Sequence, residues 1–136
     1  MHVFAYGTLM EPAVMTAVTG QRFSSQPAEL RGYGRFRVRD AAYPGLVAQP
    51  AAATQGVLYR EVDADALSRL DTFEAAMYDR RALTVDIDER PTGRRSLSAE
   101  VYVVRSSERA RLSSEKWDPG QFRRLHLDAY LQGYAR

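Results

Sequence analysis

Apolar and polar residues alternate in several short stretches of this chain, and this alternation constrains the fold more than any other sequence feature. Within residues 35–39, Phe36 and Val38 alternate with arginines. Residues 82–88 repeat the pattern, with three aliphatic residues set against Thr and Asp. Successive side chains of a strand point to opposite faces, so both stretches predict strands with one face in the core and one in water.

Other stretches predict further strands and three helices. Strands are expected, from apolar content and flanking turn residues, at residues 2–6, 29–33, 46–49, 55–61 and 97–104. Turn chemistry predicts loops at residues 41–45 and 91–93. Start and stop signals predict three helices. The first runs from Pro12 to about Val18 and is ended by Gly20, and the second begins at Asp63. The third begins at Asp118, with an apolar stripe of Phe122, Leu125, Ala129 and Tyr130. Many strands with few helices indicate an α+β domain with a mostly antiparallel, barrel-like sheet, and not a doubly wound fold.

The length and residue content of the chain limit the number of domains and the kinds of active or metal site that it can form. The 136 residues suffice for one domain, expected to span residues 1–136, with a core that needs no cross-links. There is no cysteine, and His2 and His126 are the only histidines. Disulfides, thiol nucleophiles and thiolate metal sites are therefore excluded, and the histidines are too few for a His-based metal cluster. We expect a site without metal or cofactor.

The charges do not indicate a polyanionic partner. The net charge is +2, from 19 basic and 17 acidic residues, and all but one of the basic residues are arginines scattered among acids. Proteins that bind nucleic acid usually concentrate basic residues on one face, so no nucleic-acid partner is expected. The apolar run at residues 3–6 is too short for a signal sequence or a membrane span, which favours a cytoplasmic protein without a membrane partner.

The helix that begins at Asp63 carries a carboxylate on its apolar face. At about 100° per residue, Leu67, Leu70 and Phe73 form one apolar stripe. Glu74 projects between Leu67 and Leu70. A carboxylate on the core side of a helix is costly unless it is paired or protonated. Glu74 is therefore a candidate for a raised pKa and for proton transfer.

This segment alone favours a structural explanation for Glu74. The helix could end at Phe73, and Glu74 would then turn back to water. It could also pair with Arg80 or Arg81, which would lower its pKa and weaken it as a base.

A second candidate segment, Tyr6-Gly7-Thr8-Leu9, lies where the first strand turns toward a helix start. Gly7 lets the backbone approach a ligand closely, and successive N–H groups near a helix start favour an anion such as a carboxylate. When these four residues are considered alone, an ordinary structural turn is the favoured explanation.

Together the two segments resemble the γ-glutamylcyclotransferase-like proteins, including their AIG2-like branch. Tyr6-Gly7-Thr8-Leu9 resembles the family's N-terminal signature. Leu70-Asp71-Thr72-Phe73-Glu74, followed by Tyr78 and Arg80, is similar to its catalytic-acid segment. The resemblance runs from residue 3 to about residue 131. Weaker matches are Leu30-Arg31-Gly32-Tyr33, Tyr43-Pro44, Gln55-Gly56-Val57-Leu58, Val101-Tyr102-Val103, Trp117 and the helix that contains Phe122, His126, Leu127 and Tyr130.

The resemblance implies a small mixed, mostly antiparallel β-barrel flanked by a few helices, with the site in a cavity of the barrel. It also implies that the α-amino group of a small γ-glutamyl compound attacks its own γ-carbonyl, forming 5-oxoproline and releasing an amine or amino acid. Glu74 takes the position of the catalytic acid/base. The implied substrate-binding residues are Tyr6, Gly7, Thr8 and Leu9, together with Tyr78. Tyr78 could contact the substrate through its phenol, but a role as a buried aromatic residue is favoured. No cofactor is implied.

One departure from the family pattern keeps a second hypothesis open. Many members have Gly after the catalytic acid, whereas Ala75 follows Glu74 here. If that position needs a positive φ, alanine would strain the turn and move the carboxylate. The alternative is then a catalytically inactive binding or interaction module on the same fold.

Two further residues have structural interpretations: His126 as a hydrogen-bonded core histidine and Trp117 as packing for the last helix. Neither the identity of the γ-glutamyl compound nor the oligomeric state can be read from the sequence.

Overall fold

A computed structural model describes residues 1–89, 91 and 93–134 of the chain. The six strands are β1 (Val3–Ala5), β2 (Ser25–Val38), β3 (Pro44–Tyr59), β4 (Tyr78–Glu89), β5 (Gly93–Val104) and β6 (Leu112–Lys116). The helical segments are η1 (Thr8–Met10), α1 (Pro12–Thr19), α2 (Ala64–Glu74), η2 (Ser106–Arg111), α3 (Pro119–Leu125) and α4 (Leu127–Tyr134).

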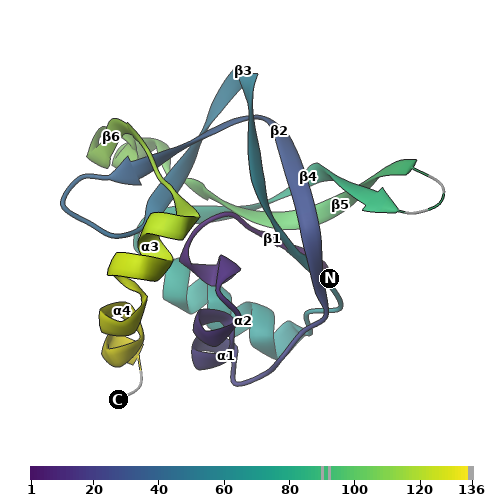
Figure 1. Ribbon diagram of the computed structural model, residues 1–136, viewed down its shortest axis with the longest axis horizontal. Helices are drawn as coiled ribbons and strands as arrows, with labels where there is room; N and C mark the ends of the chain where they lie inside the picture. Colours follow the sequence, from purple (N-terminus) through teal and green to yellow (C-terminus); the bar gives the residue numbers. More distant parts are fainter. Residues whose placement is uncertain (90, 92, 135–136) are drawn as a thin grey trace.

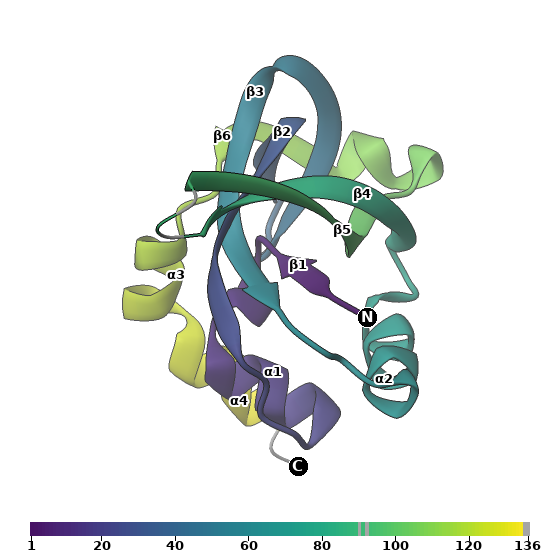
Figure 2. The same cartoon turned by 90° about the vertical axis from the view of Figure 1, so that its right-hand side faces the viewer.

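The sheet closes into a small barrel. Its order is β3-β1-β5-β4-β2-β6, and β2 also pairs with β3, so five strands form a closed ring to which β6 is added at β2 (Figures 1 and 2). The β1–β5 pairing is parallel, and the other described pairings are antiparallel. The expected mixed, mostly antiparallel α+β fold is confirmed.

The short strand β1 separates two apolar regions because its side chains alternate. Phe4 and Tyr6 point into the barrel, where they pack with buried residues such as Leu58. Val3 and Ala5 point the other way, toward the core between the barrel and the helices α1 and α2. The N-terminal turn that follows β1 is therefore held between the barrel and its helical layer.

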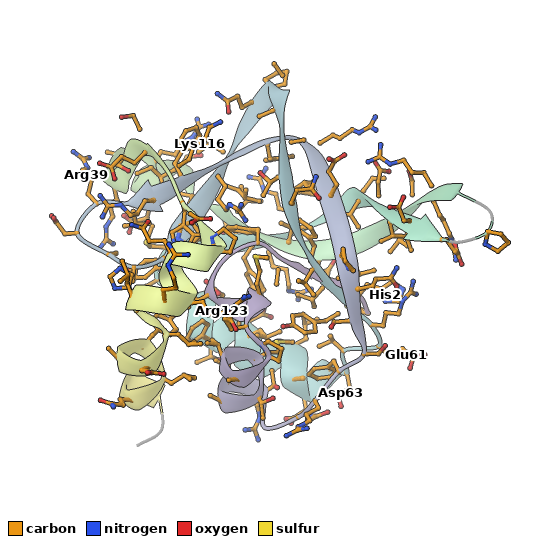
Figure 3. The ribbon with its side chains drawn as sticks, viewed as in Figure 1. His2, Arg39, Glu61, Asp63, Lys116 and Arg123 are labelled. Carbon is orange, nitrogen blue, oxygen red and sulfur yellow. The ribbon has the colours of Figure 1, made fainter. Side chains whose placement is uncertain are left out.

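The first two α-helices begin and end as expected. Pro12 occupies the first turn of α1, and Gly20 ends it with φ 76°. In α2, the side chain of Asp63 (Figure 3) accepts a hydrogen bond from the backbone N–H of Ala66 at 2.8 Å. This helix continues through Glu74, one residue beyond the alternative end at Phe73.

The strands β2 and β3 are longer than expected. The predicted pieces at residues 29–33 and 35–39 belong to one strand, and so do those at residues 46–49 and 55–61. The pairing between them is interrupted at Arg31/Tyr33, where Gly32 has φ 87°. The loop expected at residues 41–45 is also shorter, because β3 already begins at Pro44.

The strands β4 and β5 also extend further than expected, and they form a long hairpin. They start at Tyr78 and Gly93, instead of at residues 82 and 97. The turn expected at residues 91–93 falls partly on residue 92, which lies outside the described residues. The longer β4 has a consequence for the site, since it places Tyr78 on a strand rather than in a loop.

The C-terminal part differs most from expectation. The stretch between Val104 and Trp117 contains η2 and β6, and the single helix expected from Asp118 is two helices separated at His126. Leu125, His126 and Ala129 are exposed, so the interpretation of His126 as a core histidine is wrong. Trp117 does pack against α3, with its ring centroid 5.7 Å from that of Phe122. Within the described ranges, no helix is long and apolar enough to cross a membrane.

Candidate active site

A cavity of about 170 Å³ opens where the end of β1, the end of α2 and the start of β4 meet. Its walls are mostly aromatic and aliphatic, and among the described residues that line it Glu74 alone carries a carboxyl group. The residues that line it are Phe4, Ala5, Tyr6, Gly7, Thr8, Leu9, Tyr43, Pro44, Phe73, Glu74, Ala76, Met77, Tyr78, Tyr102 and Tyr130. The two segments singled out in the sequence, Tyr6–Leu9 and Leu70–Glu74, thus both contribute to one cavity, although 61 positions separate Leu9 from Leu70.

Glu74 is the last residue of α2 and is half-buried at the cavity wall. Leu67 and Leu70, on the same helix, are buried. Removal of the carboxylate from water raises the pKa of Glu74 to about 8. At neutral pH this group changes protonation state readily, as proton transfer in both directions requires.

The arginines near Glu74 in sequence do not neutralise it. The Arg80 guanidinium donates from Nε to Asp71 Oδ1 at 2.9 Å and forms a second ion pair with Glu100. Arg81 is exposed on β4. The pKa of Glu74 is raised because burial removes its carboxylate from water. The alternative in which Arg80 or Arg81 pairs with Glu74 and lowers its pKa is therefore wrong.

The strain expected at Ala75 is also absent. Ala75 caps α2 with φ −55° and ψ −30°, which is ordinary right-handed helical backbone. Its N–H donates to the carbonyl of Thr72. Alanine suits this conformation as well as glycine would, so the residue after the candidate acid leaves the carboxylate in place.

The N-terminal segment places a short helical turn at the cavity wall. In η1 the first turn bonds run from Met10 N–H to the Gly7 carbonyl, 2.9 Å, and from Glu11 N–H to the Thr8 carbonyl, 3.2 Å. The backbone N–H groups of Thr8 and Leu9 come before the first N–H that donates within the turn, so neither has a hydrogen-bond acceptor inside the turn. Both residues are buried at the cavity wall.

Tyr6 contributes a buried ring rather than a free hydroxyl. Its phenol donates to the carbonyl of Tyr102 at 2.5 Å, and burial raises its pKa. Its own carbonyl accepts a hydrogen bond from Arg35 Nη1 at 2.8 Å. The Tyr6 side chain therefore fixes the end of β1 and forms one wall of the cavity.

Tyr78 stands at the start of β4 and is half-buried beside the same cavity. Its hydroxyl donates to the carbonyl of Pro44 at 2.6 Å, and burial raises its pKa. The phenol is thus already engaged with the backbone at the start of β3. What Tyr78 presents to the cavity is chiefly its ring.

Tyr102 and Tyr130 also line the cavity, and sequence reasoning did not select them as site residues. The Tyr102 hydroxyl donates to Asp71 Oδ1 at 2.7 Å, which ties β5 to α2. No local pattern marks either tyrosine, because each reaches the cavity only through strand register or helix packing. Among the described residues, no group of three His, Asp or Glu side chains is placed to hold a metal ion.

Gly7 is needed for close packing at the cavity. A Cβ at this position would lie 3.0 Å from both Cγ and Cδ of Pro44, whose carbonyl accepts the Tyr78 hydrogen bond. We expect Gly7→Ala to lower the free energy of unfolding by about 1–3 kcal/mol through overpacking. Urea unfolding measures this, with Gly133→Ala on α4 as the control, since nothing lies within 4 Å of a Cβ there. Equal stability of wild type and Gly7→Ala would contradict the expectation.

The fold agrees with what comparison with known proteins shows. Residues 3–119 match the family model "Gamma-glutamyl cyclotransferase, AIG2-like". The chain belongs to this family. AIG2-like protein C from Arabidopsis thaliana is 30% identical over 129 residues, which cover 95% of this chain and 73% of that protein.

Two solved structures share the fold. A solution structure from Arabidopsis thaliana superposes with a TM-score of 0.71 at 22% identity, covering 98% of this chain and 87% of that one. A structure described as a gamma-glutamyl cyclotransferase superposes with a TM-score of 0.65 at 15% identity, covering 98% and 85%. The sheet and flanking helices of this AIG2-like chain are thus those of its structural neighbours.

Proposed function

We propose that this AIG2-like protein is a γ-glutamylcyclotransferase that converts a small γ-glutamyl compound into 5-oxoproline and a free amine or amino acid. The observation that carries the proposal is the shared cavity: Glu74, with a pKa raised to about 8, faces the same space as the Gly7–Leu9 turn. The family match supports the reaction class.

The reaction moves two protons from the attacking nitrogen to the departing one. The Glu74 carboxylate takes a proton from the substrate's α-ammonium group, and the freed amine attacks the γ-carbonyl to close a five-membered ring. The protonated Glu74 then gives this proton to the departing nitrogen as the C–N bond breaks. The regenerated carboxylate takes the remaining extra proton from the ring nitrogen, and this proton leaves with the released amine as its ammonium form. Ring closure is intramolecular, so placement of the two reacting atoms supplies much of the rate.

The N-terminal turn suits the charges that this reaction presents. Thr8 and Leu9 line the cavity, and we expect their backbone amides to donate to an anion, either the substrate carboxylate or the oxyanion that forms at the γ-carbonyl. Gly7, Tyr6 and Tyr78 shape the cavity around them. The two features that favoured an inactive binding module do not weaken Glu74: Ala75 has ordinary helical backbone, and among the described residues no arginine lowers the pKa of Glu74.

A panel assay tests the proposal. Purified protein is incubated with γ-glutamyl amino acids, γ-glutamylamines and glutathione, and 5-oxoproline is measured against the Glu74→Gln variant. The proposal requires product from at least one compound at a rate above that of the variant. If every compound gives equal rates with both proteins, the catalytic role is lost for these substrates.

The cavity lining also predicts which compounds react best. Within the described part of the chain, no Lys, Arg or His lines the cavity. A released amino acid would bring a second carboxylate with no cation to receive it, and an unpaired buried charge is costly. We expect kcat/KM for a γ-glutamylalkylamine to exceed that for the γ-glutamyl amino acid of equal size by about tenfold or more, which is about 1.4 kcal/mol. Equal kcat/KM values would contradict this.

A further inference from the structure

One wall of the cavity comes from a part of the chain that the family match does not reach. Tyr130 lines the cavity from α4, whereas the matched region ends at residue 119, where α3 begins. Figure 1 shows α3 and α4 beside the N-terminal turn, and α3 contacts η1 while α4 contacts α1. The C-terminal helix pair α3–α4 is thus in direct contact with the candidate substrate loop.

Two polar contacts connect the helix pair to this loop, one at each end of η1. Thr8 Oγ1 donates to the Tyr130 hydroxyl oxygen at 3.1 Å. Arg123 Nε (Figure 3) donates to Glu11 Oε1 at 2.6 Å, in an ion pair whose acidic side chain is largely buried. The amides of Thr8 and Leu9 lie between these two contacts. The position of these donors therefore depends on the placement of α3 and α4.

The Tyr130 ring is itself held by buried packing. Its centroid lies 5.4 Å from that of Phe122 in an edge-to-face arrangement, and Phe122 is 1% exposed. Phe122 also packs against Trp117, which is buried at the end of β6. Tyr130 can therefore act as a fixed point for the hydroxyl of Thr8, which is buried as well.

We propose that Tyr130 is a positioning residue of the active site, through which the C-terminal helix pair fixes Thr8 and the backbone donors that hold the γ-glutamyl group. This inference rests on the proposed function. Every substrate of the reaction carries the same γ-glutamyl group. The loss of a residue that positions this group should therefore slow all substrates by the same factor, whatever amine is released.

Tyr130→Phe tests the role because it keeps the ring and its packing on Phe122 while removing the acceptor for Thr8. We expect kcat/KM to fall by about threefold to tenfold, the usual value of one hydrogen bond, by an equal factor for each compound in the panel. Thr8→Val removes the other partner of the same bond. The double variant should therefore be no slower than the slower single variant, since the two changes remove one interaction. Tyr33→Phe, in β2 outside the cavity, is the matched control and should leave kcat/KM unchanged.

Three results would overturn the proposal: an unchanged kcat/KM in Tyr130→Phe, a decrease that depends on the released amine, or independent effects in the double variant. A purely structural role would lower the urea midpoint and leave the kinetic effects additive. Calorimetric titration with 5-oxoproline separates this inference from the proposed function. If wild type makes no product, the proposed function fails, and Tyr130 is judged by whether Tyr130→Phe weakens 5-oxoproline binding by about threefold or more. If wild type neither reacts nor binds 5-oxoproline, both proposals are overturned.

Discussion

Glu74→Gln is expected to lower kcat for 5-oxoproline release by about 10²–10⁴-fold, the usual contribution of a positioned general acid/base. Glutamine has nearly the shape of a protonated glutamate and can neither accept the α-ammonium proton nor return it to the leaving nitrogen. Because burial raises the pKa of Glu74 to about 8, most of the wild-type side chains are already neutral at pH 7. The substitution should therefore leave the folded structure and substrate binding nearly intact, and KM should change little.

Steady-state kinetics with the best substrate of the panel measures this effect. Asp65→Asn is the matched control, since it removes a carboxylate from the exposed first turn of the same helix α2. We expect the control to retain wild-type kcat. A kcat for Glu74→Gln within about threefold of wild type would remove Glu74 from the proton transfer, because a general base contributes far more than this.

The alternation of apolar and polar residues was enough to predict the fold class and most strand centres, but not the strand lengths. Residues 46–49 and 55–61 were predicted as two strands, yet β3 continues through Pro50 and the alanines that lie between them. The pairing explains why: residues 49–52 have no partner in β2, because they lie opposite the irregularity between Arg31 and Tyr33. A proline removes one backbone N–H donor from a strand, and at position 50 no partner residue in β2 needs that donor.

The candidate site was predictable where a local pattern carried it and not where packing did. The apolar stripe of α2 placed Glu74 against the core, and the turn after β1 placed the backbone donors. Whether those segments meet depends on barrel closure, which no local pattern encodes. The polar contacts of Arg80 and the ordinary φ of Ala75 likewise depend on three-dimensional surroundings, which is why both expectations were wrong.

The raised pKa of Glu74 also predicts how stability varies with pH. In the unfolded chain the group titrates near its ordinary value of 4.5, and in the folded protein near 8. The folded state therefore holds this proton more tightly, and the resulting stabilisation is fully present below pH 4.5. It is lost progressively as the pH rises to 8, because the unfolded chain releases the proton while the folded protein must keep it or bury a charge. Above pH 8 the contribution stays constant.

Urea unfolding of wild type and Glu74→Gln across pH 4–9 isolates this contribution, because all other titrating groups are common to both proteins. Relative to the variant, the free energy of unfolding of wild type should fall by about 3 kcal/mol between pH 4.5 and pH 8. This is less than the free energy that corresponds to the whole pKa shift, because the half-buried carboxylate keeps some contact with water in the cavity. A constant difference over this range would mean that Glu74 ionises normally in the folded state. It would then lack the proton affinity needed to serve as base and acid in turn near neutral pH, whatever the panel of substrates shows.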